Sequence, residues 1–229
     1  MDELIIIQAR MSSSRLPGKI LADLGSVTLL ELLIRRLRTT TSGLPLVVAT
    51  SDQADDDPVE SFCQARTVNC FRGSLRDVAG RFLAAGQEYG AERLVRICAD
   101  SPLLDPGLVD QLVTLSAVSG ADLTTNVQVR TYPAGQSVEV LRTAALANAL
   151  QDMNDEDREH VTRYFYRNMQ SFVIVNLTSG RPWGATRLTV DTPEDLQSVR
   201  HLVAMLPGNL ATVSLEEIMA VRNKLFCHG

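Results

Sequence analysis

The sequence is 229 residues long, which suits one medium-sized domain, and we expect a single domain spanning 1–229. Hydrophobic residues make up 45% of the chain, which is typical of a globular protein, and a formal net charge of −5 argues against a broad basic surface for nucleic acid. The cysteines Cys63, Cys70, Cys98 and Cys227 form no CxxC pair, so we expect neither a disulfide framework nor a zinc site.

The first predicted element is a strand that leads into a cationic loop. The apolar run 4–7 is short and mostly β-branched, which indicates a strand buried on both faces. Three cations on one short loop repel one another unless an anion lies between them, and a polyphosphate suits the forked hydrogen bonds of Arg and the point charge of Lys. The loop carries these cations, three serines and a glycine: Arg10, Arg15, Lys19, Ser12, Ser13, Ser14 and Gly18.

This loop matches neither of two common phosphate-binding patterns. A Walker A loop would need Gly in place of Ser13 and Ser or Thr in place of Ile20. The loop also lacks the GxGxxG pattern of a dinucleotide-binding turn. Phosphate binding is therefore a hypothesis at this point, and the alternative is a solvated basic loop that closes a strand.

The N-terminus carries no targeting signal that we can identify. Its apolar run of four residues is too short for a signal peptide, and no later run approaches the length of a membrane span. We therefore expect a cytoplasmic protein that does not bind membranes.

Strands and helices alternate over the next hundred residues. Apolar runs and helical spacing predict strands over 44–49, 69–71 and 93–98, and helices over 28–38, 58–65, 74–89 and 108–117. Ser74 is the expected N-cap of the third of these helices. The alternation predicts right-handed βαβ units and a mainly parallel sheet. Because ligands bind beyond the carboxyl ends of such strands, the cationic loop, Arg72–Ser74 and Asp100 should face one crevice.

The pattern changes after Asp122. Alternation over 124–142 predicts antiparallel strands or a hairpin that leaves the main sheet. Asp191 follows the last predicted strand, with Thr192 placed to cap the next helix and Pro193 in its first turn. The remaining predictions are helices over 144–150, 156–168 and 214–221, and strands over 172–176 and 187–190.

Two carboxylates therefore stand at strand ends that face the predicted crevice, Asp100 and Asp191. Magnesium takes one or two protein carboxylates and completes its shell with water and phosphate oxygens. Together with the cationic loop they would supply what nucleotidyl transfer requires, which is charge neutralisation and a stabilised pyrophosphate leaving group. Alternatively, Asp100 is a turn residue and Asp191 a neighbour of a helix cap.

The run Asp55–Asp57 contains a D-x-D pattern that glycosyltransferases use to hold a metal and a nucleotide sugar. It stands directly before a predicted helix, where acidic residues favour the N-terminus, so we interpret it as capping and solvation. The serines 12–14 have no His–Asp pattern around them, which argues against a serine nucleophile.

The motifs resemble those of the CMP-sugar synthetases, or cytidylyltransferases. The branch they most resemble is the spore coat polysaccharide biosynthesis type, related to 3-deoxy-manno-octulosonate and acylneuraminate cytidylyltransferases. The matching blocks are collinear over nearly the whole chain and lie at 8–19, 71–81, 100–105, 132–139, 158–162 and 187–196.

This resemblance implies a Rossmann-like three-layer α/β/α nucleotidyltransferase fold that transfers CMP from CTP to an acidic sugar with Mg²⁺. It implies a homodimer formed through an excursion at about 122–142. Arg10, Arg15, Lys19 and Asp100 would be catalytic, and Asp100 and Asp191 would bind the metal. The nucleotide would contact Ala9, Arg10, Ser12, Arg15, Gly18, Lys19, Arg72, Ser74, Ala99 and Asp100. The sugar would contact Tyr132, Glu139, Arg158 and His160.

Two alternatives remain open beside this assignment. The D-x-D pattern would suit a glycosyltransferase that uses a nucleotide-sugar donor. Ala99 stands where the family usually has Gly, and Gly25–Thr28 replaces a common Gly-Lys-Pro segment, which would suit a nucleotide-binding protein without catalytic activity.

Overall fold

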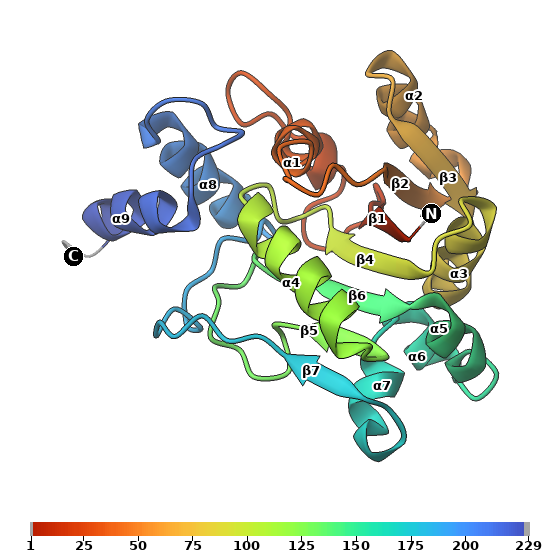
Figure 1. Cartoon of the computed structure of the whole chain (residues 1–229). Coiled ribbons are helices and arrows are strands. Elements are labelled where there is room, and N and C mark those ends of the chain that lie inside the picture. Colours follow the sequence, from red (N-terminus) through yellow and green to blue (C-terminus); the bar gives the residue numbers. More distant parts are fainter. Residues whose placement is uncertain (1, 227–229) are drawn as a thin grey trace.

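The fold is built around one seven-stranded sheet, seen in a computed structural model that describes residues 2–226 (Figure 1). The strand order is β3-β2-β1-β4-β6-β5-β7, so the chain starts in the middle of the sheet and builds outward in both directions. The strands are β1 (Glu3–Gln8), β2 (Leu46–Ser51), β3 (Asn69–Gly73), β4 (Arg93–Cys98), β5 (Leu123–Thr125), β6 (Glu139–Arg142) and β7 (Ile174–Asn176).

Most of the sheet is parallel, as the alternation of strands and helices predicts. Strand β1 pairs in parallel with β2 and β4, and β2 with β3. Among the described strands only β6 runs in the opposite direction, because it pairs antiparallel with both β4 and β5. The carboxyl ends of β1, β3 and β4 therefore share one edge, where the predicted site residues follow.

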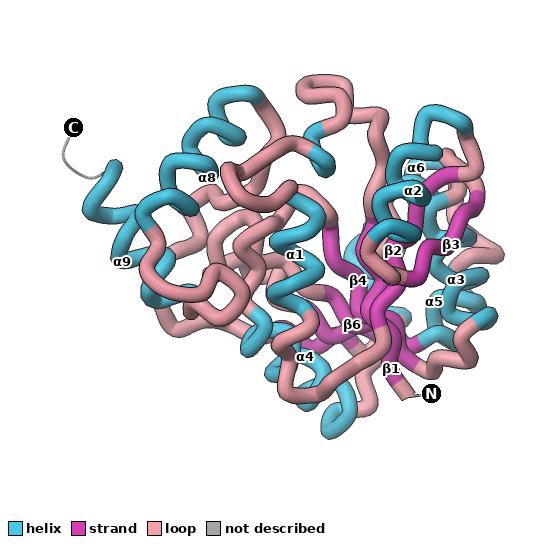
Figure 2. The backbone as a smooth tube through the Cα atoms, turned by 90° about the horizontal axis from the view of Figure 1, so that it is seen from above, coloured by secondary structure: helices cyan, strands magenta, loops and turns pink. Residues whose placement is uncertain are grey.

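Helices cover both faces of the sheet and make three layers (Figure 2). Ile5 and Ile7 of β1 pack into the core beneath α1, α2, α4, α8 and α9, whereas Leu4 and Ile6 pack against α3, α5 and α7. This alternation explains why residues 4–7 of β1 are all apolar. The helices are α1 (Leu29–Leu37), α2 (Asp57–Ala65), α3 (Val78–Glu88), α4 (Pro106–Ser119), α5 (Thr143–Ala149), α6 (Asp155–Glu159), α7 (Arg163–Arg167), α8 (Pro193–Met205) and α9 (Leu215–Phe226), with short 3₁₀ turns η1 (Lys19–Leu21), η2 (Ala54–Asp56) and η3 (Met169–Ser171).

The prediction for 122–142 is right about strand direction and wrong about placement. Strands β5 and β6 are antiparallel to each other, but they continue the main sheet through β4 instead of leaving it. The reason is that Val140 and Leu141 are fully buried and contribute to opposite cores, so β6 has the two apolar faces of an interior strand.

Three other predictions need correction. Residues 187–190 form no strand; Arg187 makes only an isolated bridge with Ala134. The helix predicted over 156–168 is divided into α6 and α7, because His160 leaves helical geometry at φ −111° and ψ 60°. The side chain that caps α3 belongs to Asp77, which accepts from the Gly80 N–H at 2.8 Å, and not to Ser74.

The helix starts predicted near the C-terminus are confirmed. The Thr192 side chain accepts from the Asp195 N–H, and the Asp195 side chain accepts in return from Thr192, which completes a capping box at α8 with Pro193 in the first turn. Ser214 and Glu217 exchange the same pair of bonds at α9. Among the described residues, no helix is both long enough and apolar enough to span a bilayer.

Candidate active site

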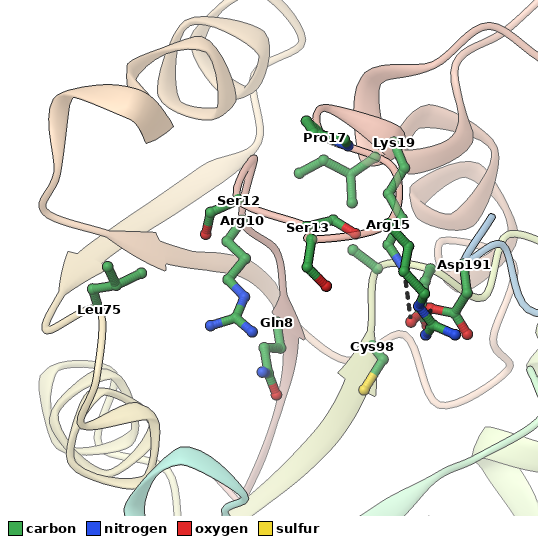
Figure 3. A pocket seen from close by; sticks show the side chains of 14 residues that line it. Gln8, Arg10, Ser12, Ser13, Arg15, Pro17, Lys19, Leu75, Cys98 and Asp191 are labelled. Carbon is green, nitrogen blue, oxygen red and sulfur yellow. Dashed lines mark hydrogen bonds and ion pairs between the residues drawn. The ribbon is translucent and has the colours of Figure 1, made fainter. Parts of the chain in front are cut away.

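A pocket of about 640 Å³ lies at the carboxyl edge of the sheet (Figure 3). It opens between the ends of β1 and β4, as the strand order predicts. Cations of the loop after β1 and the two predicted carboxylates meet at one end of it, and Arg10 and Leu75 lie toward the other. It is lined by Gln8, Arg10, Ser12, Ser13, Ser14, Arg15, Pro17, Lys19, Ile20, Leu75, Cys98, Ala99, Asp100 and Asp191.

The cationic loop is held in shape by its own backbone and by one buried carboxylate. The Gly18 N–H donates to the Met11 carbonyl at 2.9 Å, and Gly18 adopts φ +72°, a conformation that L side chains rarely adopt. The Met11 N–H donates at 2.6 Å to Asp56, which is 1% exposed. Asp56 thus fastens the loop to the end of β2. It neither caps α2 through its side chain nor faces solvent, contrary to our interpretation of the acidic run.

Lys19 joins the two predicted carboxylates. Its Nζ donates to Asp191 at 2.8 Å and to the Val190 carbonyl at 2.7 Å, and it lies 3.4 Å from Asp100. Residues that are 81 and 172 positions away from Lys19 in sequence therefore surround one ammonium group. The Lys19 side chain is only 11% exposed, so these contacts are shielded from bulk water and are stronger than surface ion pairs.

Asp100 and Asp191 meet because the segment before α8 runs alongside the turn after β4. The Val190 N–H donates to the Asp100 carbonyl at 2.9 Å, and the Leu188 N–H donates to the Ala134 carbonyl at 2.7 Å. Gly135 permits this approach, since a Cβ there would lie 2.9 Å from the Leu188 carbonyl carbon. The two carboxylates are thus positioned by backbone pairing and not by a shared strand.

Asp191 has more cationic neighbours than Asp100. Arg15 lies 3.2 Å from one Asp191 oxygen, and Arg187 pairs with the other. Burial raises the pKa of Asp191, but the hydrogen bond from Lys19 and the positive charges of Lys19, Arg15 and Arg187 outweigh it and lower the pKa from the ordinary value of an aspartate. Asp191 is therefore ionised at neutral pH.

Two cations on this edge form ion pairs that are partly exposed to water. Arg15 is 60% exposed in its ion pair with Asp191, and Arg10 is 37% exposed and 3.6 Å from Glu159. Such exposed pairs contribute about 1 kcal/mol or less, so an anionic ligand would displace them at small cost.

Cys98 lines the pocket, but its chemistry excludes it as a nucleophile at neutral pH. Burial raises the pKa of its thiol to about 11, and the nearby positive charges of Arg96 and Lys19 only partly oppose this. The thiol is therefore protonated, and the protonated form is a poor nucleophile. Cys63, Cys70 and Cys98 are all free thiols, and Cys227 lies outside the described residues.

Of the ten predicted nucleotide contacts, six line this pocket: Arg10, Ser12, Arg15, Lys19, Ala99 and Asp100. Ala9 and Gly18 shape the loop backbone behind it. Arg72 is turned toward α2, where it pairs with Asp57 and Glu60 at 2.7 Å each. Ser74 lines a second hollow of about 600 Å³, whereas its neighbour Leu75 lines the main pocket.

The predicted sugar contacts are dispersed around the main pocket. Arg158 lines the second hollow and pairs with Asp77 at 2.7 Å. His160 is exposed just after α6. Tyr132 lines a separate small hollow of about 110 Å³ with Trp183. Glu139 is 2% exposed inside the sheet. None of the four lines the main pocket.

Sequence reasoning missed several residues that shape the site, among them Gln8, Leu75, Cys98 and Arg187. Gln8 and Cys98 are the last residues of β1 and β4, so the rule that strand ends meet the ligand could have found both. Arg187 stands four residues before Asp191, and the sequence predicts a strand over 187–190. That prediction does not show that the Arg187 side chain pairs with Asp191.

The acidic run 55–57 does not line the pocket that contains Asp100 and Asp191. Asp55 and Asp56 line a hollow of about 260 Å³ that shares Ser12 and Leu75 with the main pocket. Asp57 is occupied by Arg72 at 2.7 Å.

Comparisons with known proteins identify one family. A sequence model for cytidylyltransferases matches residues 4–227. The spore coat polysaccharide biosynthesis protein SpsF of Bacillus subtilis (strain 168) is 34% identical over 231 residues, covering 97% of this chain and 95% of that protein. A 3-deoxy-manno-octulosonate cytidylyltransferase of Chlamydia trachomatis serovar A is 35% identical over 134 residues, covering 56% of this chain and 51% of that protein. The structure of a cytidylyltransferase from Leptospira borgpetersenii serovar Hardjo-bovis is similar with a TM-score of 0.94 at 30% identity, covering 98% and 95% of the two chains.

Proposed function

The chain belongs to the cytidylyltransferase family, and from this premise we propose that it transfers CMP from CTP to an acidic sugar and releases pyrophosphate. The acidic sugar is suggested by the partial likeness to 3-deoxy-manno-octulosonate cytidylyltransferases. The likeness to SpsF suggests a product used for surface polysaccharide. The observation that carries the proposal is the convergence of Lys19, Asp100 and Asp191 at one end of the pocket.

In this proposal the loop cations hold the triphosphate. A sugar hydroxyl attacks the α-phosphorus, a new P–O bond forms to the sugar, and the bond to the bridging oxygen of pyrophosphate breaks. Arg15 and Lys19, which both contact Asp191, neutralise the negative charge that develops on the leaving group. No covalent enzyme intermediate is required.

Magnesium is part of the proposal, with Asp100 and Asp191 as its ligands. Their donor chemistry fits, because Mg²⁺ accepts carboxylate oxygens and needs only one or two of them beside phosphate and water. The Lys19 ammonium lies between both carboxylates, so this position already favours a cation. When bound, the metal would screen the phosphate charge and help to orient the triphosphate. Its binding requires that the triphosphate draws Lys19 away from at least one carboxylate.

A pyrophosphate-release screen tests this function. It crosses the four nucleoside triphosphates with a panel of sugar acids, with Mg²⁺ and with a chelator. We expect release that requires both CTP and a sugar acid and stops when the chelator is added. CTP binding without release for any acceptor would favour a nucleotide-binding protein, and release with another triphosphate would overturn the assignment of CTP.

We also propose that the protein is a homodimer, formed at the β7 edge of the sheet. Three large apolar side chains lie exposed around this edge, Val129, Met169 and Val173, with exposed fractions of 56%, 49% and 59%. An edge strand with exposed apolar neighbours invites pairing with another chain.

The double variant Val129→Asp/Val173→Asp is expected to convert a dimer into a monomer, because two buried charges per subunit would oppose association. Light scattering after size exclusion measures the mass. Met205→Asp is the matched control, since Met205 is 55% exposed on α8, outside this edge, and it should leave the mass unchanged. A wild-type chain of monomer mass at micromolar concentration would contradict the proposal.

A further inference from the structure

A buried row of polar side chains runs across the sheet from the main pocket. Arg96 of β4 donates through one terminal nitrogen to Glu139 of β6 and through the other to the Gln8 side-chain oxygen at 3.1 Å. On the far side of Glu139, the Tyr166 hydroxyl donates to its carboxylate at 2.5 Å. The side chains of Arg96 and Glu139 are 16% and 3% exposed.

Such a row is costly to place inside a sheet. Removing two charges from water carries a penalty that their attraction often fails to offset, and apolar replacements are frequently as stable or more so. Arg96 stands directly opposite Glu139 in the strand register, where an apolar pair would suit the surrounding core. The row therefore calls for a role beyond stability, and its pocket end is Gln8, which lines the main pocket.

The contact with Arg96 determines how the Gln8 amide is oriented. A guanidinium has only donors, so the side-chain oxygen of Gln8 must face Arg96. The NH₂ group is thereby left to face the pocket, and it can only donate hydrogen bonds. Arg96 thus fixes a neutral donor at the end of β1.

Gln8 projects into the pocket apart from Arg15, Lys19 and Asp191, the group that holds the leaving pyrophosphate in the proposed function. Its side chain is on the same face of β1 as Leu4 and Ile6, which pack against α3, α5 and α7. Ile20, the residue that follows Lys19, packs instead into the core on the other face of the sheet, together with α1. In Figure 3, Gln8 and Arg10 project into the pocket apart from the group formed by Arg15, Lys19 and Asp191.

We propose that Gln8 is a specificity-determining residue whose NH₂ group donates to an oxygen of the acceptor sugar, and that Arg96 is the positioning residue that orients it. The inference rests on the proposed sugar transfer and adds a named contact to it. It also gives Glu139 a different role from the direct sugar contact that the family resemblance implies, since Glu139 holds Arg96 and does not line the pocket.

Two substitutions of Gln8 test this role. Gln8→Glu is isosteric and keeps an oxygen toward Arg96, but it replaces the donor with a second acceptor. Gln8→Met is neutral, similar in length, and lacks both groups. We expect each variant to raise the KM for the acceptor sugar about tenfold or more, because a binding hydrogen bond is lost. The dissociation constant for CTP, measured by calorimetry on Gln8→Met, should change less than threefold.

The outcomes separate this inference from the proposed function. An acceptor KM within twofold of wild type in Gln8→Glu would show that Gln8 has only a structural role, and equal losses in CTP affinity and acceptor KM would place Gln8 on the nucleotide. Either result overturns the inference while the transfer reaction stands. A wild-type chain that binds CTP but releases pyrophosphate with no acceptor overturns both.

Discussion

Replacing Lys19 with methionine is expected to lower kcat/KM for pyrophosphate release by about a thousandfold. Methionine keeps much of the length and apolar volume of the side chain but removes the ammonium group. Within residues 2–226, that group is the one cation in contact with both Asp100 and Asp191, at 3.4 and 2.8 Å. Without it, the two carboxylates lose the positive charge between them, and the leaving pyrophosphate loses a donor that is shielded from water.

Lys19→Arg should not restore this activity, although it keeps the charge. The ammonium group also donates to the Val190 carbonyl at 2.7 Å. Its three N–H groups therefore point at three separate acceptors, which surround one nitrogen atom. A planar guanidinium fork is larger and cannot reproduce this arrangement. We expect kcat/KM at least tenfold below wild type for this variant.

The chain offers a matched control for these substitutions, because it contains only two lysines, Lys19 and Lys224. Lys224 lies exposed on α9, far along the chain from the pocket, and Lys224→Met should leave kcat/KM unchanged. Calorimetry with CTP and thermal melting of each variant distinguish a lost phosphate contact from a lost fold. A Lys19→Met enzyme within threefold of wild type would refute the role given to Lys19.

The parts of this site that lie close together in sequence could be predicted well. The strand over 4–7, the loop cations after it and the turn after β4 are all encoded by local patterns, and the rule for parallel sheets brings them to one edge. The capping box at Thr192 is equally local, because the cap and its partner are three residues apart.

The rest depends on contacts between distant segments. Sequence patterns predict an extended backbone at 187–190, but not that it pairs with Ala134 and the Asp100 turn in place of a strand. They also cannot show which partner an arginine takes. The sequence predicts Arg72 directly after a strand over 69–71, but Arg72 lies within β3, and Asp57 and Glu60 of α2 hold its side chain away from the pocket.

Arg36 shows the same limit within a single helix. The sequence places it among three arginines near the end of α1, where cations suit the helix dipole. In the fold it is fully buried. Its guanidinium donates to three backbone carbonyls, those of Leu104 at 2.8 Å, Leu210 at 2.6 Å and Val213 at 2.8 Å. It therefore joins α1 to the turn after β4 and to the segment before α9.

Arg36→Met is accordingly expected to lower the free energy of unfolding by about 3–5 kcal/mol, because it leaves buried carbonyls without donors. Urea unfolding at pH 7 measures this change. Burial lowers the pKa of Arg36 to about 10, so the group is still charged in both folded and unfolded states at that pH, and protonation does not contribute to the difference. Arg35→Met is the adjacent control, since Arg35 is 55% exposed and pairs with Glu31 one turn away, a contact worth about 0.5 kcal/mol. Equal losses for the two variants would mean that the three carbonyls find other donors, and that the C-terminal helices are held against α1 by apolar packing alone.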